Sequence, residues 1–459
     1  PLDAVKVGHP DGIERDLQRL RLCREKLGSG TRIMMDANQG MDVPTALALA
    51  AQAKEIGLQW FEEPINKDNY AGYQIIRNQC GIAIACGERE YDCQALKELI
   101  KRNAIDMWQP DLIRMGGVEP WRNSIALANA HGVIDFLDEM AENTFRPHDA
   151  FTVGEVFHDK PGELPRFIGD RGVFSTMFDF AETLAGQSSL GWYANEPVTP
   201  EAYKAACFSS QERARDVGFL CNIIENHDEP RGVSHYIPEG QCTPQAKKLL
   251  GGLNFMLRGL PFIYQGQEIG MENRRCRSID EVDDISARDE YQVALAAGLT
   301  PREAMETVNR FSRDNARTPF QWDGTNQAGF TAGEPWLPVN PNYGEINLAA
   351  QRQDPDSVWN FYRALIRLRK DPRYSQAVVY GELEPWLPEQ KNLMAYFRRG
   401  EDRTLLVLGN FQQEPQDAAL PGEAEAVLLN NYHALRMENG RVRLEPWQFA
   451  VLELKRDRS

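Results

Sequence analysis

One repeating unit dominates the first 131 residues: a short apolar run, an acidic residue, and a segment with helical periodicity. The apolar runs cover residues 32–35, 58–61, 82–86 and 105–109, and the acidic residues behind them recur every 23 to 26 positions. Strands and helices that alternate at this spacing predict a parallel sheet. Repetition of the unit favours a (β/α)8 barrel.

The acidic residues of this repeat are Asp36, Glu62, Glu88 and Asp111. Because the carboxyl ends of barrel strands share one mouth, we expect the four carboxylates to converge there. Clustered carboxylates repel one another unless a cation or a proton lies between them, and oxygen ligands on a rigid rim suit Mg²⁺. The alternative is that each acid simply caps the helix behind it.

The composition excludes several classes of protein. The net charge of −16 without a basic run argues against nucleic acid and anionic membranes as partners. No apolar stretch reaches the roughly 18 residues of a transmembrane helix, and no signal peptide is recognisable. The 8 cysteines form no CxxC pair, so a zinc ribbon and a disulfide framework are not indicated. A reducing compartment, the cytoplasm, is the expected location.

Several motifs in this first part identify a family. They are residues 35–39 (MDANQ), 60–65 (WFEEPI), 87–88 (GE), 109–111 (QPD) and 116–118 (GGV). Residues 4–131 thereby resemble the mandelate racemase branch of the enolase superfamily, in which acid-sugar dehydratases are the nearest relatives. The resemblance implies that Asp36, Glu62 and Glu88 bind Mg²⁺. It also implies that Lys6 is the second lysine of a Lys-x-Lys pair whose first position holds Ala4.

The enolase-type pattern stops before its site is complete. Asp111 matches the aspartate that orients a catalytic histidine on the next strand, but no such histidine follows. His131 belongs to the preceding helix by its sequence context. The lid domain that precedes the barrel in that superfamily is also not recognisable.

The motifs after residue 131 indicate a different kind of reaction. Residues 151–154 form an apolar run that ends at Glu155, and residues 222–224 lead into the sequence ENHDEPR. An aspartate and a glutamate at strand ends of one barrel are the equipment of a glycosidase, since one carboxyl protonates the leaving oxygen and others stabilise the charged sugar. A single glutamate after a strand is usually just solvated, whereas a histidine beside an aspartate in such a loop indicates binding of hydroxyl groups.

Residues from about 133 to the C-terminus are similar to the α-amylase family (glycoside hydrolase family 13), in its α-glucosidase and oligo-1,6-glucosidase branch. Further matching stretches are residues 312–319 (SRDNARTP), 321–323 (QWD), 329–330 (GF) and 335–337 (PWL). The resemblance implies that Glu155 is the general acid/base and that Asp228 stabilises the transition state. His227 would bind sugar hydroxyls, and Arg317 would line the substrate mouth. The alternative for Arg317 is a structural ion pair with Asp314 or Asp323.

The nucleophilic aspartate of that family has no counterpart in its usual motif. Gly132 occupies its place, while Asp135, Asp138 and Asp149 lie in a helical and loop context. We therefore predict three parts: an enolase-like partial barrel (1–131), an amylase-like second half-barrel (132–354) and a C-terminal antiparallel β-sandwich domain (355–459).

The predicted fold is an α/β hybrid (β/α)8 barrel followed by the small sandwich. In one continuous barrel the strand ending at Asp111 would neighbour the strand ending at Glu155, so Asp111 could replace the nucleophile. The predicted function is a retaining α-glucosidase on short α-glucosides, with α-1,6-linked ones as a candidate class, and with an incomplete site. The alternatives are a Mg²⁺-dependent acid-sugar dehydratase and a catalytically silent chimera. The expected partner is a small oligosaccharide or sugar-acid substrate.

Overall fold

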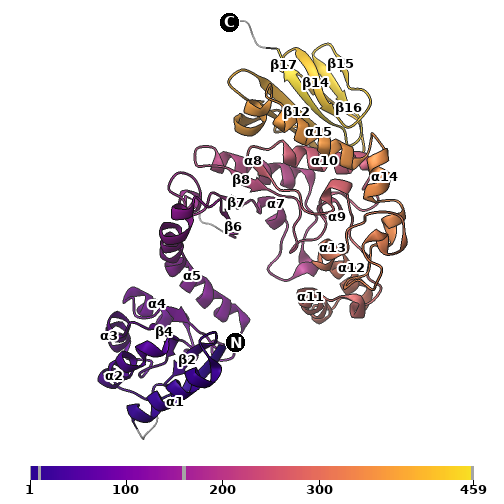
Figure 1. Cartoon of the computed structure of the whole chain (residues 1–459). Coiled ribbons are helices and arrows are strands. Elements are labelled where there is room, and N and C mark those ends of the chain that lie inside the picture. Colours follow the sequence, from indigo (N-terminus) through magenta and orange to yellow (C-terminus); the bar gives the residue numbers. More distant parts are fainter. Residues whose placement is uncertain (1, 9–11, 158–161, 456–459) are drawn as a thin grey trace. The chain divides into compact units, whose positions relative to one another are not determined.

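The protein divides into two compact units, residues 1–148 and 149–459 (Figure 1). The structure is a computed structural model that describes residues 2–8, 12–157 and 162–455. Each unit contains its own parallel sheet and its own buried core.

The first unit is an alternation of strands and helices around a five-stranded parallel sheet in the order β1-β2-β3-β4-β5. Its strands are β1 (Leu2–Lys6), β2 (Arg32–Asp36), β3 (Leu58–Glu62), β4 (Ala83–Cys86) and β5 (Met107–Trp108). Its helices are α1 (Ile13–Leu27), α2 (Val43–Ala53), α3 (Tyr70–Cys80), α4 (Cys93–Lys101) and α5 (Val118–Met140), with short helical turns η1 (Lys54–Ile56), η2 (Ala141–Phe145) and η3 (Arg146–His148). The predicted alternation of strands and helical segments is therefore present in this unit.

Helix α2 shows how the local sequence sets these elements. The Asp42 carboxylate accepts a hydrogen bond from the Thr45 backbone N–H at 2.9 Å, which caps the helix, and Pro44 occupies the first turn. Gly57 ends the segment with a φ of 71°, a conformation that glycine adopts without strain. The buried face of the helix, which includes Leu49, packs into the core of the unit.

The second unit begins with a four-stranded parallel sheet in the order β6-β7-β8-β9. Its strands are β6 (Val153–Gly154), β7 (Thr176–Phe178), β8 (Leu220–Asn222) and β9 (Leu260–Pro261). Its helices are α6 (Leu164–Phe167), α7 (Ala181–Leu184), α8 (Pro200–Ala214), α9 (Gly232–Tyr236), α10 (Pro244–Phe255), α11 (Ile285–Ala296), α12 (Pro301–Phe311), α13 (Asp314–Arg317) and α14 (Leu348–Gln353), with turns η4 (Trp192–Ala194), η5 (Gln267–Ile269), η6 (Ile279–Glu281), η7 (Asn326–Gly329) and η8 (Pro341–Gly344).

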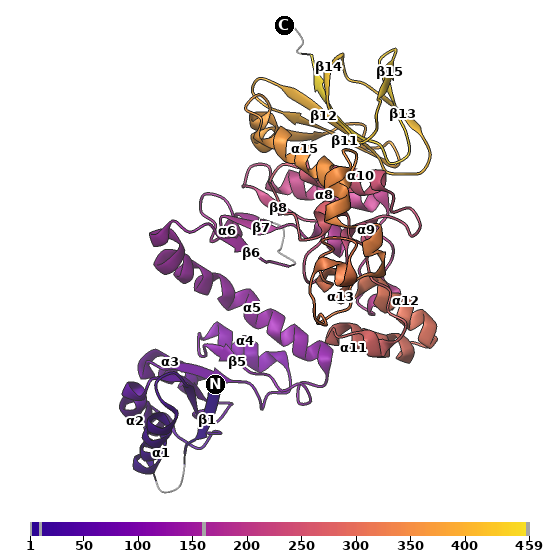
Figure 2. The same ribbon diagram turned by 45° about the vertical axis from the view of Figure 1, so that its right-hand side comes forward.

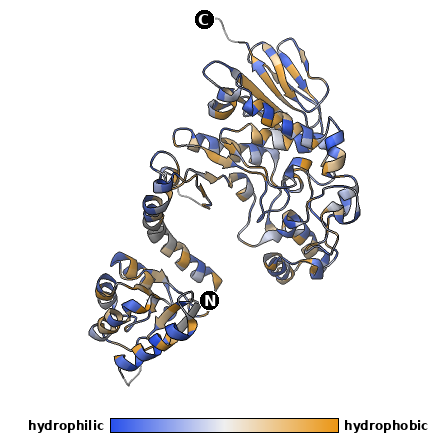
Figure 3. Cartoon of the chain, viewed as in Figure 1, coloured by the Kyte–Doolittle hydropathy of each residue, from blue (hydrophilic) through white to orange (hydrophobic). Residues whose placement is uncertain are grey.

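Helix α15 (Val358–Lys370) and turn η9 (Gln376–Tyr380) lead into an antiparallel domain. One sheet has the order β10-β11-β12-β17-β14 and a second has the order β13-β16-β15 (Figure 2). Their strands are β10 (Glu382–Pro385), β11 (Leu393–Arg399), β12 (Thr404–Asn410), β13 (Gln416–Ala419), β14 (Ala424–Asn430), β15 (Arg436–Glu438), β16 (Arg441–Leu444) and β17 (Phe449–Leu454). Hydrophobic residues gather on these strands (Figure 3), and buried side chains from both sheets, such as Phe397 and Val442, form one cluster. The predicted sandwich is confirmed.

Strand β5 pairs with β4 in the first unit, and strand β6 pairs with β7 in the second. Each of β5 and β6 has only two residues, so it offers few backbone hydrogen bonds. Helix α5 follows β5 in the chain, and its 23 residues form a helix about 35 Å long. That Asp111 and Glu155 end neighbouring strands of one barrel stays a prediction.

All eight cysteines are free thiols. Among the residues that the structure describes, no helix has both the length and the apolar character needed to cross a lipid bilayer.

Candidate functional site

Asp228 lies in the loop that follows strand β8, and two arginines hold its side chain in place. Its Oδ1 accepts hydrogen bonds from Arg317 Nη2 at 2.8 Å and from Arg313 Nη1 at 3.4 Å. Its own backbone N–H donates to Asn226 Oδ1 at 2.7 Å, which fixes the turn that carries the carboxylate. Two guanidinium groups on one oxygen fix the orientation of this carboxylate.

His227 lies beside the same carboxylate. Its Nε2 is 3.3 Å from Asp228 Oδ2, and its backbone oxygen accepts from Arg317 Nε at 2.8 Å. The predicted grouping of Asp228, His227 and Arg317 is therefore present in the structure. Arg317 contacts Asp228 rather than Asp314 or Asp323, so the structural ion-pair alternative for this residue is not observed.

A buried ion pair stabilises the loop that carries Asp228. Arg231 Nη1 donates to Glu225 Oε1 at 3.0 Å, and both side chains are fully buried. The same guanidinium donates to the backbone oxygens of Gln265 and Ala316, at 2.6 and 3.1 Å. Burial raises the pKa of Glu225, while the Arg231 charge opposes that shift. Arg231 thus ties the Asp228 loop to the segment that carries Arg313 and Arg317.

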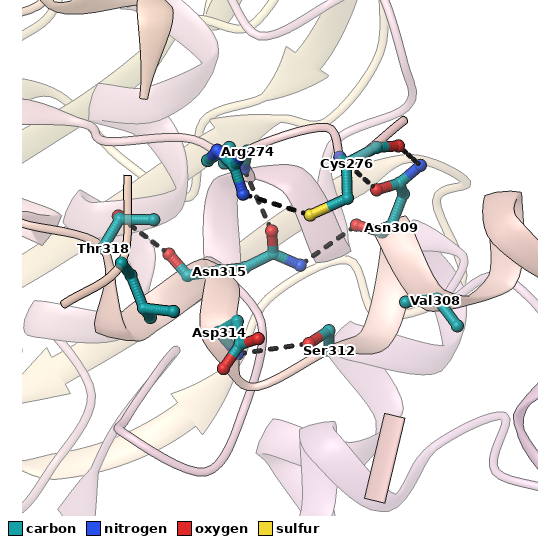
Figure 4. A pocket seen from close by; sticks show the side chains of 9 residues that line it. Arg274, Cys276, Val308, Asn309, Ser312, Asp314, Asn315 and Thr318 are labelled. Atoms are coloured by element: carbon teal, nitrogen blue, oxygen red, sulfur yellow. Dashed lines mark hydrogen bonds between the residues drawn. The ribbon is translucent and has the colours of Figure 1, made fainter. Parts of the chain in front are cut away.

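That segment is fixed by a hydrogen-bonded cluster around a small cavity of about 10 Å³, room for about one water molecule (Figure 4). The Asn315 side chain accepts from the Arg274 backbone N–H at 3.0 Å and donates to the Asn309 backbone oxygen at 3.0 Å. The carboxylate of Asp314 accepts from the backbone N–H of Asp283 at 2.7 Å. These contacts hold α13 so that Arg313 and Arg317 lie one helical turn apart beside Asp228.

A pocket of about 100 Å³ opens beside Asp228. We call it the Asp228 pocket. Its lining residues are Thr183, Ala185, Gly186, Gln187, Trp192, Asn195, Glu196, Asp228, Glu229, Pro230, His235 and Phe311. Burial and the neighbouring Asp228 charge raise the pKa of Glu229 to about 7. Polar groups around an aromatic wall are the usual lining of a site for a small polar ligand.

Glu155 directly follows β6 and is exposed. Because β6, β7 and β8 are parallel, Glu155 and the loop that carries Asp228 leave the same edge of one sheet. Strand β7 lies between them, so their strands are about 10 Å apart. The structure therefore places two of the predicted catalytic residues at one sheet edge.

The enolase-type acids surround a lysine in the first unit. The Lys6 ammonium donates to the Asp36 carboxylate, and this hydrogen bond, with the charges of Asp36, Glu88 and Glu62, raises the pKa of Lys6. Glu62 Oε2 accepts from Trp60 Nε1 at 3.2 Å and from Gln109 Nε2 at 3.4 Å.

In the part of the chain that the structure describes, no three His, Cys, Asp or Glu side chains are arranged to hold a metal ion. Lys6 supplies positive charge to Asp36 in this arrangement, and binding of Mg²⁺ by Asp36, Glu62 and Glu88 stays a prediction.

Asp111 behaves as a turn residue. Its Oδ1 accepts from the backbone N–H groups of Ile113 and Arg114, both at 2.9 Å. These contacts cap a turn and not the following helix, because α5 has Gly117 as its N-cap without a side-chain hydrogen bond. Its role as a replacement nucleophile stays a prediction.

Family models match three parts of the chain. Residues 93–381 match the model described as alpha amylase, catalytic domain, which is more than half of the sequence. The chain belongs to the alpha-amylase family. Residues 393–451 match the alpha-amylase SusG C-terminal domain. Residues 2–135 match an enolase C-terminal domain-like model, so residues 93–135 are shared between this model and the alpha-amylase model.

Curated relatives of this alpha-amylase family member include glucosidases. It is 34% identical to the probable oligo-1,6-glucosidase 3 of Bacillus subtilis, over 66% of this chain and 54% of that protein. It is 34% identical to the oligo-1,6-glucosidase of Parageobacillus thermoglucosidasius, over 71% of this chain and 59% of that one. A trehalose-6-phosphate hydrolase of Bacillus subtilis is 32% identical over 70% of this chain and 58% of that protein. The chain thus spans just over half the length of these relatives.

Solved structures of the same family resemble the protein. The trehalulose synthase of Pseudomonas mesoacidophila has a TM-score of 0.69 and 27% identity, with 96% of this chain and 86% of that chain covered. The isomaltulose synthase of Erwinia rhapontici has a TM-score of 0.67 and 26% identity, with the same coverage. These likenesses confirm the barrel-type α/β fold with C-terminal antiparallel sheets.

Several site residues were not assigned a role from the sequence. Arg313 could have been found, because it lies four positions before Arg317 and therefore on the same helical face. The other residues are Glu229, His235 and Trp192 of the Asp228 pocket. Their positions depend on the packing of α9, α12 and η4, for which the sequence carries no local signal.

Proposed function

We propose that the protein is a glycoside hydrolase-type protein that binds short α-glucosides at the edge of the β6–β9 sheet. The observation that carries the proposal is the Asp228 carboxylate, which two arginines orient beside a pocket with an aromatic wall. Membership of the alpha-amylase family and the oligo-1,6-glucosidase relatives support glucosides as the substrate class.

In the proposed mechanism Glu155 is the general acid/base and Asp228 stabilises the positively charged sugar in the transition state. The sequence offers no nucleophile in the family motif, and Asp111 as its replacement on a strand beside that of Glu155 stays a prediction. We therefore expect turnover to be weak, with binding stronger than catalysis.

Release of 4-nitrophenol from 4-nitrophenyl α-glucoside tests the proposal. Activity should disappear in Glu155→Gln and persist in the control Glu389→Gln, an exposed glutamate of the C-terminal domain. Asp111→Asn should leave activity unchanged if this residue only caps its turn. Hydrolysis that survives in Glu155→Gln contradicts the assigned role of Glu155.

A second candidate, an acid-sugar dehydratase, rests on the enolase C-terminal domain-like match and on the acids around Lys6. Such a site would hold Mg²⁺ at Asp36, Glu62 and Glu88, where the metal would stabilise an anionic intermediate. The ion pair between Lys6 and Asp36 opposes this reading. Formation of a 2-keto-3-deoxy product from sugar acids, dependent on Mg²⁺, would favour it over the glucosidase.

A further inference from the structure

His235 is a buried histidine with unsatisfied hydrogen-bonding groups. Both of its ring nitrogens are buried, and neither has a hydrogen-bond partner among the described residues. The ring is fixed edge-on against Tyr236, with 4.6 Å between centroids, and against Phe311 at 6.0 Å. It lines the Asp228 pocket from helix α9. A buried polar group without a partner costs free energy, so it calls for a ligand or a water molecule on the pocket side.

The imidazole is neutral at physiological pH. Burial, together with the nearby charge of Arg310, lowers the pKa of His235 to about 4. A neutral imidazole offers one N–H donor and one lone-pair acceptor. A hydroxyl group, which is both donor and acceptor, complements it, whereas an anion can use only the donor.

The rest of the pocket has the same preference for an uncharged polar ligand. Its lining includes the acids Asp228 and Glu229 and the amide of Gln187, and neither lysine nor arginine occurs among its lining residues in the described chain. The nearby Arg313 and Arg317 are engaged with Asp228. The acids repel a phosphate and accept hydrogen bonds from hydroxyls, while Trp192 offers an apolar surface for the C–H face of a sugar ring.

We infer that His235 is a specificity-determining residue that binds a hydroxyl group of an uncharged sugar unit in the Asp228 pocket. The inference takes its ligand class from the proposed function. It goes further in naming the recognition residue and in excluding phosphorylated glucosides, although one relative is a trehalose-6-phosphate hydrolase.

Isothermal titration with isomaltose, used as the probe, tests the inference without requiring turnover. His235→Phe keeps the ring and removes both nitrogens. Its affinity should be about tenfold weaker, equivalent to about 1.4 kcal/mol. His433→Phe, a change at an imidazole that is 90% exposed on the C-terminal domain, should bind as the unchanged protein does. Equal affinity in His235→Phe overturns the inference, as does tighter binding of trehalose 6-phosphate than of isomaltose.

Thermal melting separates recognition from a structural role. Because His235→Phe removes two unsatisfied polar atoms from a buried site, its melting temperature should be unchanged or higher. A loss of cooperative melting in this variant would mean that the imidazole is structural, which overturns the inference.

Nitrogen-15 NMR of the unmodified protein gives a measurement that needs no variant. Among the seven histidines, His235 is recognised as a signal that stays neutral between pH 5 and 8. That signal should shift when isomaltose is added, and its failure to move at saturation overturns the inference.

The binding and hydrolysis assays distinguish failure of the inference from failure of the proposed function. Hydrolysis that depends on Glu155 while His235→Phe binds normally would retain the proposed function and reject the inference. Isomaltose binding that depends on His235 in a protein without hydrolysis would retain the inference and reject the catalytic proposal.

Discussion

The Arg317 guanidinium and the Asp228 carboxylate, 89 residues apart in the sequence, form an ion pair with 2.8 Å between Nη2 and Oδ1. Arg317 also binds the backbone oxygen of His227, so one side chain fixes both the carboxylate and the loop that presents it.

Replacement of Arg317 with Gln should weaken binding of isomaltose about ten- to hundredfold, because a hydrogen bond to a charged group contributes about 1.5–3 kcal/mol. Isothermal titration measures the change. Arg373→Gln, at an exposed arginine paired with Asp371, is the control and should bind as the unchanged protein does. An unaltered affinity in Arg317→Gln would show that Asp228 does not need this partner.

Arg231→Met should destabilise the second unit by about 3–5 kcal/mol, because it leaves the buried Glu225 carboxylate without its charged partner. The free energy of unfolding from urea denaturation measures this. Glu225→Gln combined with Arg231→Met should recover part of the loss. Lys455→Met, at the exposed pair with Glu423, should cost less than about 1 kcal/mol. Similar losses at both sites would reject the supporting role of Arg231.

Glu182 predicts a dependence of stability on pH. Burial raises its pKa to about 8, and the charge of Asp179 adds to the shift. The folded state therefore holds a proton that the unfolded state releases above about pH 4.5, so this stabilisation is complete below pH 4.5 and is lost as the pH rises towards 8. The free energy of unfolding, measured by urea denaturation, should fall over this range by an amount on the order of 5 kcal/mol, because each pKa unit corresponds to about 1.4 kcal/mol.

Glu182→Gln should flatten this pH dependence, since the amide cannot ionise, whereas the exposed control Glu389→Gln should retain it. A slope of the same size in Glu182→Gln would assign the dependence to another group.

Lys6→Met should create or strengthen binding of Mg²⁺ at the first unit. Removal of the ammonium from Asp36 frees a carboxylate and deletes a charge that repels the metal, so affinity should rise about tenfold or more. Isothermal titration with MgCl₂ measures the change. Lys26→Met, at an exposed lysine of α1, should have no effect. The heat of Mg²⁺ binding to Lys6→Met should disappear when Glu62→Gln is added to that variant. The absence of any binding heat in Lys6→Met itself would reject the Mg²⁺ proposal.

The local sequence predicted most of the elements. The apolar runs at residues 32–35 and 58–61 correspond to β2 and β3 within one residue, because a buried parallel strand needs a continuous apolar segment. The strands in the apolar runs at 105–109 and 151–154 are shorter than predicted, with two residues each. Closure of a barrel depends on pairing between strands that are distant in sequence, and neither run contains information about its partner.

The site residues that could be predicted are those that belong to a recognisable sequence motif. The grouping of Asp228, His227 and Arg317 follows from a resemblance in sequence, and the structure places these residues together. The turn contact of Asp111 was not predicted, because the alternatives weighed for this residue were capping of the following helix and a catalytic role. The pocket role of His235 depends on its contacts with Phe311, 76 positions away, and such packing leaves no periodic trace in the sequence.

Helix α5 contains the last part, residues 118–135, of the segment that two family models share. The hydrogen bonds of a helix close within a few residues of one another, so its backbone is indifferent to the ancestry of the sequence on either side. A strand offers no such freedom, because a change of one residue in its register turns every side chain to the opposite face. An exchange of half-barrels between unrelated enzymes, by nature or by an engineer, would therefore be tolerated best at a helix such as this one.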